Sequence, residues 1–199
     1  ISHGSPPAAQ IGRGQARRLG NLVVTLFDAT QLSRGSLEIQ PERMDLAAAA
    51  REVIVQFERA ARDQGSEILS HLPSECFGVW DPTRIEQVIG NLLSNAIKYG
   101  AGSPIQLDLE HVEGTARLSV TDHGIGIPAT DLATIFERYG RAVDPKTYSG
   151  LGLGLHVSRE IVRAHGGDII VKNRPNSGVT FVVELPCADL PHRPDRHGE

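Results

Sequence analysis

Two asparagines and a lysine recur at helical spacing within the segment RIEQVIGNLLSNAIKYG, residues 84–100. At about 100° per residue of a helix, Asn91, Asn95 and Lys98 line one flank beside an apolar face. Asparagine has a poor propensity for helix interiors, so this spacing indicates specific hydrogen bonding, with a solvated polar flank as the alternative. Amide oxygens are hard, neutral ligands that suit Mg²⁺ already bound to phosphate, and an ammonium can neutralise a phosphate. The flank is therefore a candidate magnesium and phosphate site.

A second candidate is the segment DHGIGIP, residues 122–128, directly after a predicted strand. Gly124 and Gly126 let a ligand approach the backbone closely, and Asp122 can accept a hydrogen bond from a ring amino group. Taken alone, the segment is equally consistent with an ordinary turn, because Asp, Gly and Pro are common turn residues.

A third candidate is the segment GLGLGLHVS, residues 150–158, where glycines alternate with leucines before a predicted helix. Backbone amides and the positive end of that helix can meet a polyphosphate. The segment is not a Walker loop, because no Gly-Lys-Ser/Thr follows. It also lacks the dinucleotide fingerprint, because no glycine lies three positions after Gly152. A purely structural glycine hinge is the alternative.

Four segments occur together and in order, and they resemble the motifs of the sensor histidine kinase catalytic domain. They are residues 91–99, similar to the asparagine box; 122–126, the first glycine box; 136–139, the phenylalanine box; and 150–155, the second glycine box. Residues 165–186 also resemble the family's last helix end and final hairpin. The resemblance implies an α+β fold, a two-layer α/β sandwich of the Bergerat type. ATP would lie under a mobile lid spanning about Tyr139 to Leu151.

The resemblance implies catalytic roles for three residues, Asn91, Lys98 and Arg141. Asn95 would hold Mg²⁺ with support from Asn91, and Lys98 and Arg141 would face the phosphates of ATP. Transfer of the γ-phosphate to an imidazole nitrogen develops charge, which the metal and a cation would offset.

The resemblance also implies which residues bind the nucleoside. Tyr99 would border the nucleotide and Asp122 would bind the adenine amino group. Small residues and one leucine would complete the cofactor-binding set: Gly124 and Gly126 beside the base, and Gly150, Gly152, Gly154 and Leu155 at the end of the lid.

Hydrophobic periodicity and cap residues predict the elements that position these side chains. Helices are predicted for residues 11–33, for 46–64 after an Asp45 N-cap, for the segment from an Asp81 cap to Tyr99, and for 153–165. Strands are predicted for residues 36–40, 67–72, 76–80, 105–112, 116–121, 168–172 and 178–185. Between them, a long irregular region, 124–154, is predicted to serve binding and to contain one short helical piece, 130–136.

The predicted domain organisation starts with residues 1–10, a linker or remnant. Residues 11–40 resemble the second helix of the family's dimerisation and phosphotransfer domain and its link, with a possible homodimer through residues 11–33. Residues 41–187 are the predicted ATP-binding catalytic domain, and 188–199 a flexible tail. His3 precedes Gly4 rather than an acidic residue, so it is not the expected phospho-acceptor, and little self-phosphorylation is expected.

Composition excludes several other functions. A net charge of −4 with scattered Lys and Arg argues against a nucleic-acid partner. No stretch reaches about 18 apolar residues, so no membrane contact is expected from these residues. Cys76 and Cys187 lie 111 positions apart without Cys-x-x-Cys spacing, which indicates neither a zinc site nor a disulfide framework. A cytoplasmic location is expected, as part of a larger membrane-anchored or hybrid kinase.

Two related ATPase classes share this nucleotide site. ATP hydrolases place a glutamate one turn before the Mg²⁺-binding asparagine, where it activates water, whereas this chain has Asn91, whose amide cannot accept a proton. Serine-directed kinases usually lack a dimerisation helix. The expected function is transfer of the ATP γ-phosphate to a histidine on the dimerisation domain, for relay to a response regulator receiver domain. The alternative is a nucleotide-binding pseudokinase or scaffold.

Overall fold

The computed structural model describes Leu26, Asp28, Thr30 and residues 37–140, 152–174 and 177–187. The chain divides into two compact units, Ile1–Leu37 and Glu38–Glu199. In the first unit Leu26, Asp28 and Thr30 are helical, and the Thr30 hydroxyl donates to the Leu26 carbonyl one turn earlier, at 2.8 Å. The rest of that predicted helix, His3 and the tail 188–199 lie outside the described residues.

The second unit is built on a five-stranded mixed sheet with the order β2-β4-β5-β7-β6. Strand β2 (Ile68–His71) pairs in parallel with β4 (Ile105–Val112). The other pairs are antiparallel and join β4 to β5 (Thr115–Asp122), β5 to β7 (Gly178–Pro186), and β7 to β6 (Asp168–Arg174). A separate two-stranded sheet, which the sequence did not predict, pairs β1 (Glu42–Asp45) with β3 (Phe77–Trp80).

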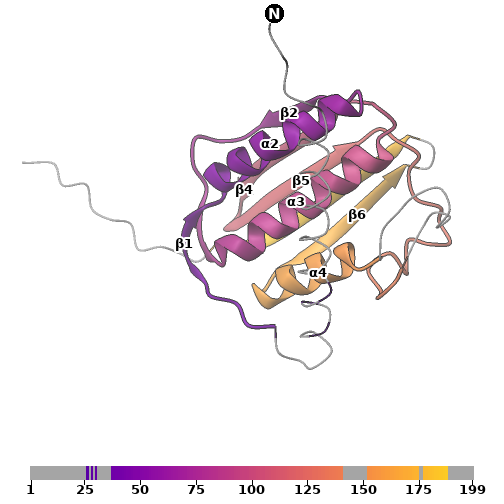
Figure 1. Ribbon diagram of the computed structural model, residues 1–199. Coiled ribbons are helices and arrows are strands. Elements are labelled where there is room, and N and C mark those ends of the chain that lie inside the picture. The colour runs from indigo at the N-terminus through magenta and orange to yellow at the C-terminus, as the bar shows by residue number, and fades with distance from the viewer. Residues whose placement is uncertain are drawn as a thin grey trace, which may run out of the picture. The chain divides into compact units, whose positions relative to one another are not determined.

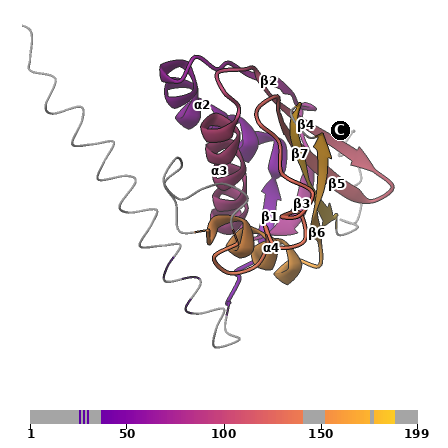
Figure 2. The same ribbon diagram turned by 90° about the vertical axis from the view of Figure 1, so that its right-hand side faces the viewer.

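Three helices cover one face of the large sheet: α2 (Leu46–Asp63), α3 (Pro82–Tyr99) and α4 (Gly154–Ala164) (Figures 1 and 2). The predicted caps are confirmed, because Asp45 accepts a hydrogen bond from the Ala47 amide and Asp81 from the Arg84 amide. No side chain caps α4 at its N-terminus. The predicted two-layer α/β architecture is therefore confirmed for this unit.

The core lies between the helices and the sheet. Alternation along β5 buries Ala116, Leu118 and Val120, since successive strand residues point to opposite faces. The next residue in that series is Asp122, which is also buried. A carboxylate thus ends a row of apolar side chains on the helix-covered face.

Two predicted elements are wrong. The predicted strand 36–40 is absent over 37–40, and the strand begins at Glu42 instead. The Gln40 amide donates to Asp81 Oδ2 at 2.8 Å, and Pro41 has no amide proton, so neither can contribute a donor to a strand ladder.

The predicted helical piece 130–136 is a series of turns. Within this piece the Thr134 and Ile135 amides both bond the Asp131 carbonyl, three and four residues back. A turn closed on one carbonyl does not continue as an α-helical ladder. Among the described residues, none of the helices has the length and apolar character needed to cross a bilayer.

Candidate functional site

The polar flank of α3 forms as predicted. Asn91, Asn95, Lys98 and Tyr99 are all partly buried, beside a fully buried face of Ile85, Val88, Ile89, Leu92, Leu93 and Ala96. The Asn91 amide nitrogen donates to the Gly154 carbonyl at 3.4 Å and to the Ser158 hydroxyl at 3.1 Å. Because Ser158 is fully buried, this contact attaches the first turns of α4 to α3.

Lys98 and Tyr99 interact at the last turn of α3. The Lys98 ammonium nitrogen lies 2.8 Å from the Tyr99 hydroxyl and 4.6 Å from the centroid of its ring. A cation at this end of a helix is favoured by the helix dipole. The pair therefore presents a positive charge beside an aromatic ring at the C-terminal end of the flank.

Asp122 ends β5 against the C-terminal end of α3. Its Oδ1 accepts a hydrogen bond from the Gly124 amide at 3.0 Å, and only 4% of the residue is exposed. Burial raises the pKa of this carboxyl, while hydrogen bonds from the Gly124 and Val179 amides act in the opposite direction. The site therefore contains a buried hydrogen-bond acceptor beside Tyr99 and Gly100.

The loop after Asp122 is pressed against the backbone of α3. A Cβ on Gly124 would lie 1.8 Å from the Tyr99 carbonyl oxygen, so only glycine fits there without a shift. Gly126 adopts a φ of 67°, in the left-handed region that favours glycine. Asn173 on β6 then holds the loop, since it accepts from the Ile127 amide at 2.8 Å and donates to the Ile127 carbonyl at 2.6 Å.

Segments on either side of the undescribed residues 141–151 lie side by side. Gly152 has a φ of 68°, and a Cβ there would meet the Gly140 carbonyl oxygen at 2.9 Å. Gly154 and Leu155 follow in the first turn of α4, next to Asn91. Gly150, Arg141 and most of the predicted lid lie outside the described residues.

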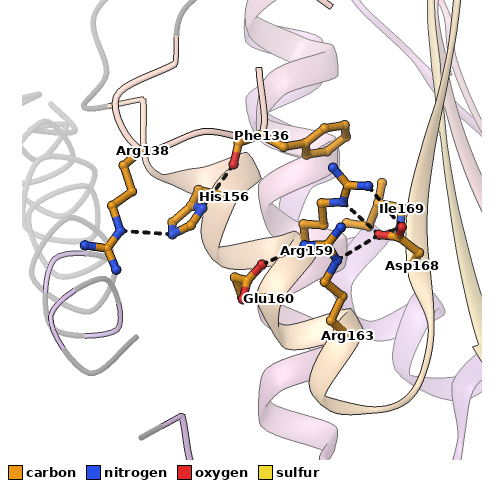
Figure 3. A network of polar contacts seen from close by, with 8 residues as sticks. All are labelled: Phe136, Arg138, His156, Arg159, Glu160, Arg163, Asp168 and Ile169. Carbon is orange, nitrogen blue, oxygen red and sulfur yellow. Dashed lines mark hydrogen bonds and ion pairs between the residues drawn. The ribbon is translucent and has the colours of Figure 1, made fainter. Parts of the chain in front are cut away.

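A polar network connects the phenylalanine-box turn to α4 (Figure 3). Arg138 Nε lies 3.3 Å from His156 Nε2, and His156 Nδ1 lies 3.0 Å from the Phe136 carbonyl oxygen. In the neutral ring Nε2 accepts and Nδ1 donates, which satisfies both contacts. The Arg159 guanidinium lies over the Phe136 ring at 4.7 Å, so α4 contacts both the backbone and the ring of Phe136.

The same guanidinium is fixed by an acidic partner at the start of β6. Arg159 donates to both oxygens of Asp168 at 2.8 and 3.0 Å, and Arg163 Nε lies 3.5 Å from Asp168 Oδ1. The hydrogen bonds from Arg159 are the main reason that the pKa of Asp168 falls to about 2.

Substituting Arg159 with glutamine is expected to return the pKa of Asp168 from about 2 towards its ordinary 3.8. A carboxylate with a lowered folded-state pKa stabilises the fold above pH 3.8, and that contribution is lost as the pH falls through about 2. Asp168 is 44% exposed, so its contribution is about 1 kcal/mol or less. Carboxyl NMR over this pH range measures the shift. Arg163→Gln is the control, with a smaller change expected, and an equal or larger one would contradict the assignment.

The structure brings together most of the predicted site residues but shows roles that the sequence did not. Asn91, Asn95, Lys98, Tyr99, Asp122, Gly124, Gly126, Gly152, Gly154 and Leu155 all lie along α3, the loop after β5 and the start of α4. Asn173 was missed because its partner, Ile127, lies 46 positions away, and the Arg159–Asp168 pair was missed because it joins a helix to a strand. His156 follows the second glycine box directly, which was a usable signal for a place beside the site.

Comparison with known proteins agrees with this geometry. Residues 80–189 match the family model of histidine kinase-, DNA gyrase B-, and HSP90-like ATPases. The chain belongs to this family. The curated relatives described below are sensor kinases, so it carries the ATP-binding catalytic domain of the sensor histidine kinases, as the motifs predicted. None of these relatives supports the pseudokinase alternative.

Two curated histidine kinase relatives illustrate the extent of the match. The adaptive-response sensory kinase SasA of Parasynechococcus marenigrum (strain WH8102) is 34% identical over 194 residues, covering 86% of this chain and 51% of SasA. The sensor protein KdpD of Escherichia coli K12 is 34% identical over 201 residues, covering 98% of this chain and 22% of KdpD. The chain thus spans about half or less of the relatives it matches.

Solved histidine kinase structures share the fold. The catalytic domain of ThkA is 32% identical, with a TM-score of 0.66 over 74% of this chain and 98% of the ThkA domain. Full-length ShkA in complex with AMPPNP is 25% identical, with a TM-score of 0.72 over 94% of this chain and 40% of ShkA.

Proposed function

We propose that the chain binds Mg²⁺–ATP along α3, the loop after β5 and the start of α4, and transfers the γ-phosphate to a histidine. The observation that carries this proposal is the buried Asp122 carboxylate at the end of β5. Isolated buried carboxylates are costly, and this one is retained next to a glycine loop and the polar flank of α3. A buried acceptor of this kind suits the amino group of adenine. Gly124 lets the loop lie against α3, and Gly126 is proposed to leave room beside the base.

The phosphate part of the site is proposed to lie between Lys98 and the first turn of α4. Lys98 supplies a positive charge, and the first turn of α4 has no side-chain cap, so its amides suit a polyphosphate. The Asn95 amide oxygen suits Mg²⁺, which would offset charge on the transferred phosphoryl group. Arg141 and Gly150 are proposed to join these residues, with Tyr99 at the border of the nucleotide.

The surroundings of Asn91 favour transfer to histidine over ATP hydrolysis. Its amide nitrogen donates to a carbonyl and a hydroxyl of α4. A glutamate here would place a carboxylate against the Gly154 carbonyl oxygen, where it would be repelled. Position 91 therefore suits a hydrogen-bond donor and not a base that activates water. We also propose that the Asn91 side chain supports the Mg²⁺ bound by Asn95.

The partners follow from the family's chemistry. We propose that the acceptor is a histidine on the dimerisation domain of a sensor kinase, and that the phosphoryl group passes on to the receiver domain of a response regulator. Residues 11–33 are proposed to contribute to a homodimer. AMPPNP, an ATP analogue, is bound by the structural relative ShkA, which supports a nucleotide site here. A cytoplasmic location is proposed because ATP and receiver domains are found there.

The test is phosphoryl transfer to a separately supplied dimerisation domain with an acceptor histidine. Incubation with Mg²⁺ and γ-labelled ATP is expected to give a label on the acceptor that is lost in acid and stable in alkali. The controls are an acceptor domain with its histidine replaced by glutamine, and a His3→Ala chain that excludes labelling at His3. Inorganic phosphate without acceptor label would indicate a hydrolase, acid-stable label a serine-directed kinase, and bound nucleotide without either product a pseudokinase.

A further inference from the structure

The side-chain amide of Asn91 contacts α4 through its nitrogen atom. This nitrogen lies 3.1 Å from the Ser158 hydroxyl oxygen and 3.4 Å from the Gly154 carbonyl oxygen. Because a carbonyl oxygen only accepts hydrogen bonds, the group that faces Gly154 must be the NH2 group of the amide. The amide oxygen, Oδ1, therefore occupies the other branch of the carboxamide, away from these two acceptors.

Ser158 is the better placed of the two acceptors. Its distance from the Asn91 nitrogen is usual for an N–H···O hydrogen bond, whereas 3.4 Å to Gly154 is long. Ser158 is 0% exposed, and the other buried residues of α4 are aliphatic: Val157, Ile161 and Val162. A hydroxyl in such surroundings is costly unless it has a partner. The contact with Asn91 provides that partner at a position that water does not reach.

The orientation of the Asn91 amide decides whether it can help to bind a cation. Its oxygen carries lone pairs that suit Mg²⁺, whereas its NH2 group is a donor and would be repelled. The two ends have nearly the same size, so packing alone does not distinguish them, and the hydrogen-bond network sets the orientation. A fixed acceptor on α4 therefore selects the orientation in which Oδ1 is available.

Gly154 leaves space over the same amide. A Cβ at this position would lie 3.7 Å from both Cγ and Oδ1 of Asn91, so a side chain there would contact the amide oxygen. Asn95 lies one turn further along the same flank of α3, at the spacing that brings helix side chains together. The Asn91 oxygen and the Asn95 amide therefore share one flank of α3.

We propose that Ser158 is a positioning residue for magnesium: its hydroxyl accepts from the Asn91 amide nitrogen and thereby keeps Oδ1 turned towards the metal that Asn95 holds. This inference rests on the Mg²⁺–ATP site proposed above and adds a residue that contacts neither the metal nor ATP. Residues of this kind orient the ligands of many metal sites, and their loss typically lowers metal affinity by about 10- to 100-fold. Without the Ser158 hydroxyl, only the long contact with Gly154 orients the Asn91 amide.

The test compares ATP affinity in Mg²⁺ with ATP affinity in EDTA, by calorimetric titration of the 199-residue chain. The ratio of the two affinities is the magnesium gain. Ser158→Ala is expected to lower this gain by about tenfold, because the Asn91 oxygen is no longer held towards the metal. Its ATP affinity in EDTA is expected to stay at the parent value, because Ser158 acts only on a ligand of the metal.

Ile161→Val is the matched control. It removes one methylene from another fully buried side chain of α4 and is expected to lower stability slightly without changing the magnesium gain. The Asn91 side-chain NH2 signals of the nucleotide-free chain are expected to shift in Ser158→Ala and to stay in place in Ile161→Val. This NMR measurement detects the hydrogen bond without metal or nucleotide.

A double-mutant cycle tests whether Ser158 acts through Asn91. Asn91→Ala is expected to lose the part of the magnesium gain that its oxygen supplies. Adding Ser158→Ala to that variant is then expected to change the gain no further, since the group that Ser158 orients is already absent. Equal losses on adding Ser158→Ala to the parent and to Asn91→Ala would show that Ser158 acts elsewhere, and the inference would be overturned.

Three other results would overturn the positioning role. They are a parent-like magnesium gain in Ser158→Ala, unchanged Asn91 NH2 signals in that variant, and an equal loss of affinity in Mg²⁺ and in EDTA, which would indicate a purely structural residue. A parent chain that binds ATP equally well in both solutions would contradict the magnesium site itself, and this inference with it. The parent titration therefore distinguishes failure of the proposed function from failure of the role of Ser158 alone.

Discussion

Replacing Asp122 with alanine is expected to weaken ATP binding by about 100-fold or more. The substitution removes a charged hydrogen-bond acceptor and leaves both the adenine amino group and the Gly124 amide without a buried partner. Asp122→Asn is expected to lie between the parent and the alanine variant, because an amide oxygen still accepts but its charge is lost. Calorimetric titration with ATP and Mg²⁺ measures both affinities.

Stability measurements separate loss of binding from loss of folding. The pKa of Asp122 is raised by burial, so the ionised carboxylate carries a desolvation cost in the folded state. Its removal is expected to lower the unfolding temperature only slightly, because relief of this cost offsets the loss of the Gly124 hydrogen bond. Asp108→Asn on β4 is the matched control, since this carboxylate contacts Gln106 and His71 and not the proposed site. Equal affinity of Asp122→Ala and the parent would show that the adenine assignment is wrong.

Gly124→Ala is expected to lower the free energy of unfolding by about 3 kcal/mol and to remove most ATP binding. The new methyl group would lie 1.8 Å from the Tyr99 carbonyl oxygen, and backbone on both sides must shift to relieve the clash. That shift moves the Asp122 loop away from α3, which separates the proposed base and phosphate ends of the site. Chemical denaturation and nucleotide titration measure the two effects.

Gly90→Ala is the matched control for that variant. Gly90 lies inside α3, where a Cβ would make an ordinary 3.4 Å contact with the Phe57 ring. Alanine is preferred over glycine in helix interiors by about 1 kcal/mol, so a small gain in stability is expected. If Gly124→Ala unfolded at the same denaturant concentration as Gly90→Ala, the close approach of the loop to α3 would not exist in solution.

The local elements were predictable because their causes are local. Asp45 and Asp81 precede long amphipathic stretches and do cap α2 and α3, and the strands predicted at 105–112 and 116–121 correspond to β4 and β5. The four kinase motifs could be recognised because each is a short, contiguous run of residues. Their order alone therefore indicated the fold and the family.

Contacts between distant segments could not be derived from these patterns. Nothing near Asn91 indicates that it would hydrogen-bond α4, and nothing near Asn173 indicates that it would hold the loop after Gly126. The strand predicted at 36–40 failed for the same reason, because Asp81, far along the chain, takes the Gln40 amide.

An NMR titration of the labelled chain with Mg²⁺ and ATP tests the central claim most directly. The account predicts saturable amide shifts concentrated in residues 91–100, 122–127 and 152–155, which lie along α3, the loop after β5 and the start of α4. Amides around Thr115 and Pro186, at the far end of the β5–β7 ladder from Asp122, are expected to move little. Shifts concentrated at that far end, or no saturable shifts at millimolar ATP, would contradict the proposed site.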